Sequence, residues 1–551
     1  MTKISLIKSV VMSVVVTLFV MNGAFAQQIV VTGKVLCDGK GVAGVVVSDG
    51  VNVVVTNKKG AYTIKSDASL SKFVHISVPS GYEVECKGSL PQFYGRLDKE
   101  AKKQSFDFNL REVDQSKYTI ITVADTHVSG PLNMRSSHSD RERFTTQLIP
   151  AINDYIATQK VPTYVMSCGD MTQANYRPSK KNNYVGYSLE DSMEDTKVNA
   201  PLYTTIGNHD HNNPPKGMVF DDSTIWLSRV DYNKACGPAY YSLNMGREHF
   251  VFVDNTFVLT NESKTSYKAD ATSGYQVKLD AQQQAWLEKD IAALDKKMVD
   301  RVVVVAHCQT INSQGKMIML GAKKFYDALK DYDVILFTGH AHRDNIAKAT
   351  INGRSVIEYT HSSTAGTAWY TPWNVDGSPG SAVAYSFEVG NKYVDREYIT
   401  YGEVKEKGYR YRVYDNVNNK WHYPITKSSG SGWSYQHDLQ DSSHKDSPAI
   451  IVNIWGAYSI DFTESTGGKG VAKVNSYDLA YRDWYWDYYR RSLYNEVPAG
   501  ETLRKAKWQA PATGGANVVK YIPQDPKAII TVRGRDVYGR VIVEFTAQAA
   551  E

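Results

Sequence analysis

The stretch DVILFTGHAHRDN (residues 333–345) joins an apolar run to a polar segment with two histidines. Residues 334–337 have the apolar, partly β-branched composition of a buried strand. His340 and His342 follow this run and are separated by one residue. Residues two apart in an extended segment face the same side, so both imidazoles can point into one site. A histidine pair at a strand end is more often structural than metal-binding, and the rest of the chain decides between these interpretations.

Other apolar runs of the chain end in residues of the same chemical kind. The runs are YTIITVAD, ending at Asp125; TYVMSCGD, ending at Asp170; PLYTTIGNHD, with Asn208 and His209; and RVVVVAH, ending at His307. Ligands of open α/β sheets bind beyond the carboxyl ends of the strands. Five strand ends with carboxylate, amide or imidazole groups therefore predict one shared site.

Helical stretches alternate with these runs. They are RERFTTQLIPAINDYIATQ (141–159), DAQQQAWLEKDIAALD (280–295), with Asp280 as its N-cap, and GAKKFYDALKDY (321–332). Residues 240–255 have the pattern of a β-hairpin. The alternation of strands and helices predicts an α/β domain whose sheets are largely buried.

Five motifs occur in a fixed order between residues 125 and 342. They are Asp125-x-His127, Gly169-Asp170, Gly207-Asn208-His209-Asp210, His307 and Gly339-His340-x-His342. This set resembles the calcineurin-like metallophosphoesterase superfamily. The resemblance implies a metallophosphoesterase α/β sandwich as the catalytic domain, over residues 117–400.

The resemblance also implies a site for two divalent ions held about 3.5–4 Å apart. By the family's pattern, Asp125, His127 and His342 hold the first ion. Asn208, His307 and His340 hold the second ion, and Asp170 bridges both. Oxygen and imidazole ligands of this kind suit Mn, Fe, Zn or Ni.

The implied reaction is hydrolysis of a phosphomonoester or phosphodiester by in-line attack of a hydroxide that bridges the two ions. Two dications, two carboxylates and this hydroxide leave a charge of about +1, which favours a phosphate group. His209 is expected to donate a hydrogen bond or a proton to the leaving group. Gln173 stands where several branches of the family have an acidic residue or a histidine, and its amide oxygen is expected to orient the imidazole. The same glutamine excludes the protein Ser/Thr phosphatase branch.

Residues 361–387 form a Gly-rich segment with several aromatic residues. It resembles a loop of secreted bacterial members that have N- and C-terminal sandwich domains. The segment is either an aromatic wall of the pocket or a surface loop anchored by its tryptophans. The candidate substrate contacts are Gln173, Asn175, Trp369, Tyr370 and Trp373. For Arg177, Lys180 and Lys181, solvated charge is favoured over an anion-binding rim. His211 is expected to be structural, and His361 either supports the site or is structural.

Strand-rich sequence flanks the α/β region. Residues 27–112 have short β-branched runs and Gly-rich turns, which predict a small antiparallel Ig-like sandwich. Residues 402–551 predict a C-terminal β-rich domain. Within it, the aromatic segment 476–491 is expected to bury against the catalytic domain rather than to stack on a sugar or polymer. The flanking domains motivate an alternative function: a non-catalytic surface glycan or polymer binding module that retains a metal site.

Residues 1–26 have the pattern of a secretory signal peptide: Lys3 and Lys8, an apolar run, and Ala24-Phe25-Ala26 before Gln27. The mature chain is expected to be periplasmic or secreted by a bacterium, and no later stretch is apolar enough to span a membrane. Removing the two lysines lowers the formal charge from +5 to +3, too small for a nucleic-acid footprint. The expected partner is a phosphorylated small molecule, lipid or glycan, and the sequence indicates no oligomeric state.

The chain has five cysteines, so at least one stays unpaired after export. Cys37 and Cys86 share the first domain and are candidates for a disulfide in an oxidising compartment. The simpler interpretation is that the cysteines are small buried strand residues.

Overall fold

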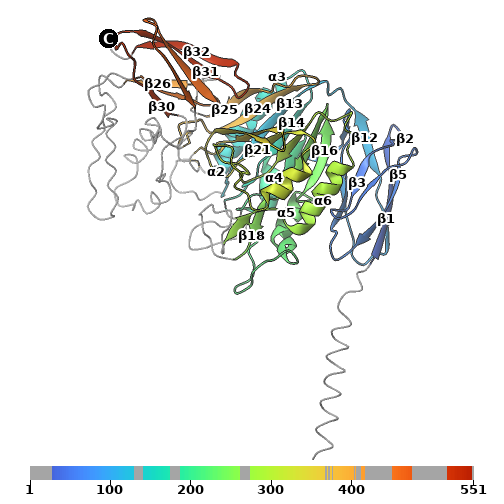
Figure 1. The fold of residues 1–551 in the computed structure, drawn as a ribbon. Helices are drawn as coiled ribbons and strands as arrows, with labels where there is room; N and C mark the ends of the chain where they lie inside the picture. Colours follow the sequence, from blue (N-terminus) through green and yellow to red (C-terminus); the bar gives the residue numbers. More distant parts are fainter. Residues whose placement is uncertain are drawn as a thin grey trace, which may run out of the picture.

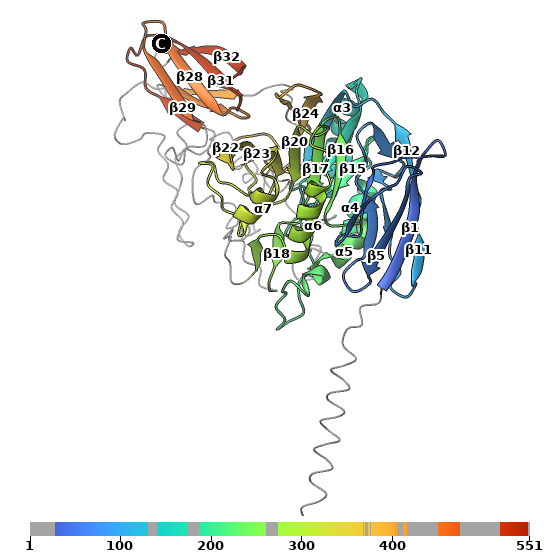
Figure 2. The same cartoon turned by 45° about the vertical axis from the view of Figure 1, so that its right-hand side comes forward.

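The computed structural model describes residues 28–129, 140–173, 187–260, 274–366, 369, 373–374, 376–402, 404, 411–415, 450–473 and 518–548. These residues form an N-terminal β domain, a central α/β domain and a C-terminal β domain (Figure 1). The two β domains lie on different sides of the central domain in both ribbon views (Figure 2). The expected signal peptide, the segment 476–491 and the cluster of Arg177, Lys180 and Lys181 lie outside the described residues.

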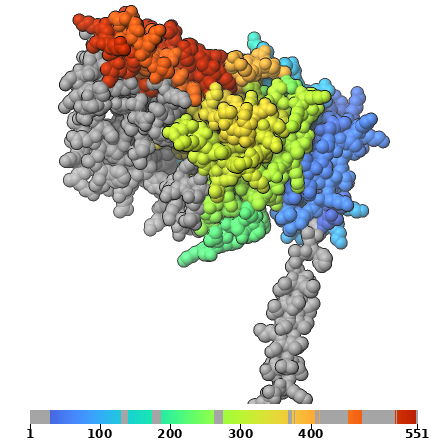
Figure 3. Space-filling model, in the orientation of Figure 1, coloured from blue at the N-terminus to red at the C-terminus, as the bar shows by residue number. Residues whose placement is uncertain are grey.

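The N-terminal domain consists of two main sheets and a short hairpin. Its strands are β1 (Gln28–Cys37), β2 (Lys40–Gly41), β3 (Val46–Ser48), β4 (Val53–Val55), β5 (Ala61–Asp67), β6 (Phe73–Ile76), β7 (Tyr82–Val84), β8 (Cys86–Lys87), β9 (Leu90–Pro91), β10 (Tyr94–Arg96), β11 (Lys103–Ser105) and β12 (Phe108–Glu112). One sheet has the order β11-β1-β12-β7, with β2 and β5 also paired to β1, and the other has the order β10-β6-β3-β4. Figure 3 shows this domain against one side of the central domain.

The prediction of a purely antiparallel sandwich is wrong for β1, which pairs in parallel with both β11 and β12. The long strand β1 meets β11 along its first half and β12 along its second half. Gly33 lies at the change of partner, where a Cβ atom would come within 1.8 Å of the Phe106 carbonyl oxygen. The absence of a side chain lets the two backbones approach closely there.

The central domain contains two sheets that pack face to face. The first has the order β15 (Leu202–Thr204), β14 (Thr163–Ser167), β13 (Lys117–Val123), β24 (Ser381–Glu388) and β25 (Asp395–Thr400). The second has the order β16 (Tyr241–Met245), β17 (Glu248–Phe252), β20 (Arg301–Val305), β21 (Asp333–Thr338), β23 (Arg354–Thr360) and β22 (Asn345–Ile351). Side chains of both sheets share one buried cluster, which includes Ile120, Tyr164, Phe250, Val303 and Phe337.

Parallel pairing joins the strands that precede the predicted ligands. Strands β13, β14 and β15 are parallel neighbours, as are β17, β20, β21 and β23. Their carboxyl ends therefore lie at one edge of each sheet. The expected hairpin at residues 240–255 is confirmed as β16 and β17, and a second hairpin, β18 (Thr256–Val258) with β19 (Tyr275–Val277), lies beyond it.

Helices cover the outer faces of the two sheets. They are α2 (Asp140–Arg143), the π-helix η1 (Phe144–Leu148), α3 (Ile149–Thr158), α4 (Leu189–Asp195), the 3-10 helix η2 (Ile225–Arg229), α5 (Val230–Ala235), α6 (Ala281–Ala292) and α7 (Ala322–Ala328). The N-cap prediction is confirmed, since the Asp280 side chain accepts a hydrogen bond from the Gln283 amide. The helix predicted over 141–159 contains a π turn just before Pro150. A proline ring crowds the carbonyl four residues earlier, and the wider turn relieves that contact.

The C-terminal domain has two sheets, β26-β27-β30 and β29-β28-β31-β32. The strands are β26 (Tyr411–Asp415), β27 (Ile450–Ile454), β28 (Ser459–Glu464), β29 (Lys469–Lys473), β30 (Val518–Tyr521), β31 (Ile529–Arg535) and β32 (Val541–Gln548). Arg540 and Asp395 join this domain to the central one through an ion pair of 2.9 Å. Among the described residues, no helix is both long enough and apolar enough to cross a membrane.

Candidate metal centre

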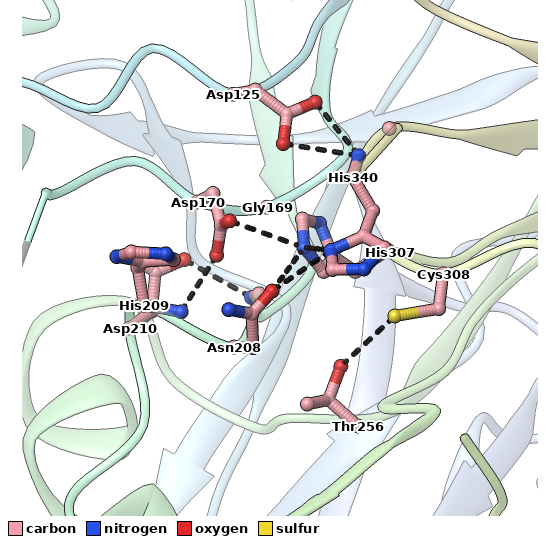
Figure 4. Close-up of polar contacts among 12 residues, drawn as sticks. Asp125, Gly169, Asp170, Asn208, His209, Asp210, Thr256, His307, Cys308 and His340 are labelled. Atoms are coloured by element: carbon pink, nitrogen blue, oxygen red, sulfur yellow. Dashed lines mark hydrogen bonds and ion pairs between the residues drawn. The ribbon is translucent and has the colours of Figure 1, made fainter. Parts of the chain in front are cut away.

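The predicted ligands follow the carboxyl ends of five strands and converge on one site. Asp125 follows β13, Asp170 follows β14, Asn208 follows β15, His307 follows β20, and His340 follows β21. Figure 4 shows the side chains of Asp170, Asn208, His307 and His340 turned toward one another. Four groups of three potential ligands lie here, and within each group the ligand atoms are within 4.8 Å of one another.

The backbone is left-handed at five of these positions. The residues and their φ angles are Asp125 (52°), His127 (45°), Asp170 (53°), His340 (65°) and His342 (51°). The part of the chain that the structure describes has only three other non-glycine residues with positive φ. Such conformations cost energy in residues with a Cβ atom and cluster at functional sites. The local strain therefore marks the same residues as the sequence motifs.

Asp125, His127 and His342 form the first group. The two Nε2 atoms of His127 and His342 are 3.0 Å apart, and Asp125 Oδ1 lies 3.4 Å from the latter and 3.8 Å from the former. Burial holds the pKa of His127 well below its usual value. Burial also acts to lower the pKa of His342, but the charge and hydrogen bond of Asp125 together with the charge of Asp170 raise that pKa.

Asn208, His307 and His340 form the second group. Asn208 Oδ1 lies 2.9 Å from His307 Nε2 and 3.0 Å from His340 Nδ1, and these two nitrogens are 3.2 Å apart. His307 Nδ1 is 2.8 Å from the carbonyl oxygen of Cys168. A carbonyl only accepts hydrogen bonds, so Nδ1 carries the proton in the neutral ring and Nε2 presents its lone pair to the site.

Asp170 lies between the two groups. Its Oδ2 is 3.5 Å from His127 Nε2 and 3.2 Å from His307 Nε2, while its Oδ1 accepts a 2.7 Å hydrogen bond from the His209 amide. Burial alone would raise the pKa of this carboxyl, but His307, His209 and His127 hold it well below the usual range. A Cβ atom on Gly207 would lie 2.2 Å from Asp170 Oδ1, so only glycine fits at that position.

The donor set fits two divalent cations. Imidazole, carboxylate and amide atoms face one another at 2.9–3.8 Å in a largely buried site. Most of these atoms are acceptors, and they repel one another unless a proton or a cation lies between them. Cys308 also lies within one of the groups of potential ligands. Burial raises the pKa of its thiol well above the usual value, and its Sγ is 3.7 Å from Thr256 Oγ1. The neutral thiol is a poor metal ligand.

His209 is oriented by a main-chain group. Its Nδ1 lies 2.5 Å from the carbonyl oxygen of Gln173 and donates to it. The side-chain amide of Gln173 is expected from the sequence to orient the ring, but in the structure the main-chain carbonyl of Gln173 does so. The ring of His209 meets the ring of His127 edge-on, with centroids 4.7 Å apart.

Of the two alternatives for residues 361–387, the structure favours anchoring tryptophans over an aromatic wall at Trp369 and Trp373. Trp369 is buried, and its Nε1 donates a 2.6 Å hydrogen bond to the carbonyl of Thr126, between Asp125 and His127. Trp373 is also buried and meets Trp455 of the C-terminal domain at a centroid distance of 6.4 Å. Both side chains support the fold behind the ligands. The other two candidate contacts, Asn175 and Tyr370, lie outside the described residues.

The remaining histidines of interest have structural partners. His211 is buried between Ser228 and Asp254, at 2.9 Å and 3.2 Å, which confirms its structural role. His361 is buried too: its Nδ1 lies 2.8 Å from the Thr338 carbonyl and its Nε2 2.9 Å from the Tyr385 hydroxyl. It therefore supports the end of β21, just before His340. All five cysteines are free thiols, so Cys37 and Cys86 form no bridge in this structure.

Two supporting residues are not evident from the sequence. Asp344 is buried and accepts from Arg396 Nη2 at 2.8 Å and from the Tyr398 hydroxyl. Its amide donates to Asp376, whose carbonyl accepts from Asn453 of the C-terminal domain. Tyr275 places its hydroxyl 3.0 Å from His340 Nε2. Neither residue belongs to a motif, because each acts through partners distant in sequence.

Two family models match the chain. The model described as the N terminal of calcineurin-like phosphoesterase matches residues 29–113, and the calcineurin-like phosphoesterase model matches residues 118–344. Together they cover more than half of the chain. The chain belongs to the calcineurin-like phosphoesterases. Members of this family are metal-dependent phosphoric ester hydrolases with a dinuclear metal centre, and the fold described above agrees with that membership.

Several solved structures are similar to this phosphoesterase over about half of its length. A dimetal phosphatase from Danio rerio is 15% identical with a TM-score of 0.32, over 52% of this chain and 99% of that one. A putative 5'-nucleotidase from Staphylococcus aureus is 14% identical with a TM-score of 0.29, over 52% and 53%. A 5'-nucleotidase precursor from Thermus thermophilus is 13% identical with a TM-score of 0.27, over 52% and 54%. This chain thus spans about half the length of either nucleotidase. No curated protein matches the sequence.

Proposed function

We propose that this phosphoesterase is an exported hydrolase that cleaves a phosphomonoester or phosphodiester with the help of two divalent ions. The observation that supports this most directly is the position of Asp170, whose Oδ2 lies 3.5 Å from a histidine of one ligand group and 3.2 Å from a histidine of the other. A carboxylate between two such groups is suited to bridge two cations.

Each ligand group is proposed to hold one ion. Asp125, His127 and His342 would hold the first, Asn208, His307 and His340 the second, and Asp170 would contact both. When bound, the ions would polarise a phosphate oxygen and lower the pKa of a water molecule between them. Mn, Fe, Zn and Ni all accept this combination of oxygen and imidazole ligands.

His209 is proposed to serve the leaving group. The Gln173 carbonyl holds the proton on Nδ1, so Nε2 is the nitrogen left to face the substrate. A protonated His209 can then donate from Nε2 to the leaving oxygen. The ring also lies with His127 and Asp170 in one of the groups of potential ligands, so it stands next to the proposed ions.

The proposed substrate is a phosphorylated small molecule, lipid or glycan, and the proposed location is the bacterial periplasm or the medium. The location is supported by the charge, apolar run and Ala-Phe-Ala sequence of residues 1–26. Expression of the full gene in a Gram-negative host with N-terminal sequencing of the product tests it. A mature chain that starts at Gln27 in the periplasmic fraction is expected, and an intact Met1 in the cytoplasm would contradict it.

Hydrolysis of p-nitrophenyl phosphate and of bis(p-nitrophenyl) phosphate with added Mn²⁺ tests the activity. Loss of a residue that only hydrogen-bonds to a metal ligand typically lowers activity by about 10- to 100-fold. Asp170→Ala and His340→Ala remove proposed ligands themselves and are expected to lower turnover by more than that. Asp154→Asn, an exposed change on α3, is the control and should keep full activity. Equal turnover by the wild type and both alanine variants would refute the proposal.

A further inference from the structure

The two ring nitrogens of His340 face different partners. Its Nδ1 points toward the second group, 3.0 Å from Asn208 Oδ1 and 3.2 Å from His307 Nε2. Its Nε2 lies 3.0 Å from the hydroxyl oxygen of Tyr275. The rings of His340 and Tyr275 are nearly perpendicular, at 89°, with centroids 5.9 Å apart.

A neutral imidazole carries one proton, so only one nitrogen at a time offers a lone pair. If His340 is to bind an ion through Nδ1, the proton must reside on Nε2. That N–H then needs an acceptor, because an unpaired buried donor is costly. A phenol oxygen can accept from Nε2–H while its own hydrogen rotates away.

The other histidine of the second group meets the same requirement in a different way. His307 uses Nε2 toward the site, and its Nδ1 donates to the main-chain carbonyl of Cys168 at 2.8 Å. A main-chain acceptor is present whatever side chain occupies that position. For His340 the acceptor is a side chain, so its contribution can be removed by substitution.

Tyr275 is held in place by the hairpin β18–β19. Val258 pairs with Tyr275 across this hairpin. At its base, Asn255 accepts from the Cys308 amide at 3.0 Å and donates to the Cys308 carbonyl at 2.7 Å. The hairpin is thereby fixed to the segment that carries His307, and its tyrosine reaches across to His340.

We propose that Tyr275 is a positioning residue that fixes the His340 tautomer required for binding the second ion, an inference that rests on the proposed dinuclear function. Its hydroxyl acts through His340, which belongs to the second group. Loss of its hydroxyl should therefore weaken the second ion selectively.

Metal binding by Tyr275→Phe tests this inference. Wild type and variant are stripped with EDTA and titrated with Mn²⁺, and the bound metal per chain is measured at each free concentration. The wild type is expected to bind two ions. The variant should bind the first ion as the wild type does and the second about 10- to 100-fold more weakly.

Tyr240→Phe is the matched control, because Tyr240 is buried to a similar degree and its hydroxyl donates to the Gly50 carbonyl, far from the site. It should bind both ions as the wild type does. Equal melting temperatures of all three proteins in EDTA separate loss of metal from loss of folding. Unchanged uptake of both ions by Tyr275→Phe would overturn the role of Tyr275 and leave the dinuclear function intact. Uptake of fewer than two ions by the wild type would overturn the dinuclear function as well.

Discussion

The first and second ligand groups contain equal numbers of side chains but differ in what holds those side chains. In the second group, His307 is fixed by the Cys168 carbonyl and His340 contacts the Tyr275 hydroxyl. In the first group, the His342 side chain is 38% exposed, and His127 Nδ1 is buried without a hydrogen-bond partner among the described residues. Outer partners orient metal-binding histidines and raise affinity. We therefore expect the second proposed ion to be held more tightly than the first.

Asp344→Asn tests the support of the first group and should have the largest effect. Asp344 lies two residues after His342 and forms a buried ion pair with Arg396. Breaking such a pair typically costs about 3–5 kcal/mol of stability. Urea unfolding should report that loss, and metal analysis should report preferential loss of the first ion. Asp300→Asn removes an exposed pair with Arg247 and should cost at most about 1 kcal/mol. Equal effects of the two substitutions would contradict the importance of Asp344.

Glu358→Gln tests the support of the second group through its pH dependence. Glu358 is buried and accepts from the Thr310 and Ile311 amides after His307 and from the Thr338 hydroxyl before His340. Burial raises its pKa from 4.5 to about 7. Between these two values the folded protein retains a proton that the unfolded chain releases. The contribution of protonated Glu358 to the free energy of unfolding is therefore complete below pH 4.5 and is lost as pH rises through 7.

The loss of this Glu358 contribution lowers the free energy of unfolding by about 3 kcal/mol at most. Urea unfolding in EDTA at pH 5 and pH 8 should therefore show a larger loss of stability for the wild type than for Glu358→Gln. Parallel pH profiles for the two proteins would show that Glu358 is ionised throughout and that burial does not shift it.

Chelation tests the comparison without any substitution. During dialysis against increasing EDTA, the protein should release its ions in two steps, with the affinities separated by about 10- to 100-fold. The partly stripped protein should retain the ion at Asn208, His307 and His340. Spectroscopy of a Co²⁺-loaded sample, compared with His342→Ala, can identify the retained site. Release in a single step would remove the distinction between the two groups.

Trp369→Phe should have the smallest effect. The substitution removes the hydrogen bond from Nε1 to the Thr126 carbonyl, with a net loss of about 1 kcal/mol in the free energy of unfolding. It should weaken the first ion slightly and leave the second unchanged, as measured by Mn²⁺ titration. Trp226→Phe, at a tryptophan that is 42% exposed, serves as the control. A weaker second ion in Trp369→Phe would contradict the assignment of this residue to the first group.

The sequence predicts the α/β fold and the convergence of the ligands because both depend on local patterns. Apolar runs such as residues 334–337 define strands, and the polar residue that follows each run defines the site. The supporting contacts have no such pattern. Tyr275 and His340 are 65 residues apart, and the partner of His209 is a main-chain carbonyl that any residue at position 173 would supply.

The same reasoning explains why the sequence left the role of the tryptophans open and why the predicted pairing of β1 was wrong. Aromatic residues in a Gly-rich segment suit either a pocket wall or a buried anchor, and only the tertiary packing of Trp369 against Thr126 distinguishes them. The parallel pairing of β1 depends on the path of the chain to β11 and β12, which residue composition does not encode. Sequence patterns thus predict the candidate ligands, while the structure shows the contacts that hold their side chains.

Anomalous diffraction from Mn²⁺-loaded crystals tests the central claim most directly. The wild type should show two peaks about 3.5–4 Å apart, with Asp170 between them. His340→Ala should lose the peak next to Asn208 and His307, and His342→Ala should lose the peak next to Asp125 and His127. A single peak in the wild type, or two full peaks in both variants, would contradict a site built from two ligand groups joined by Asp170.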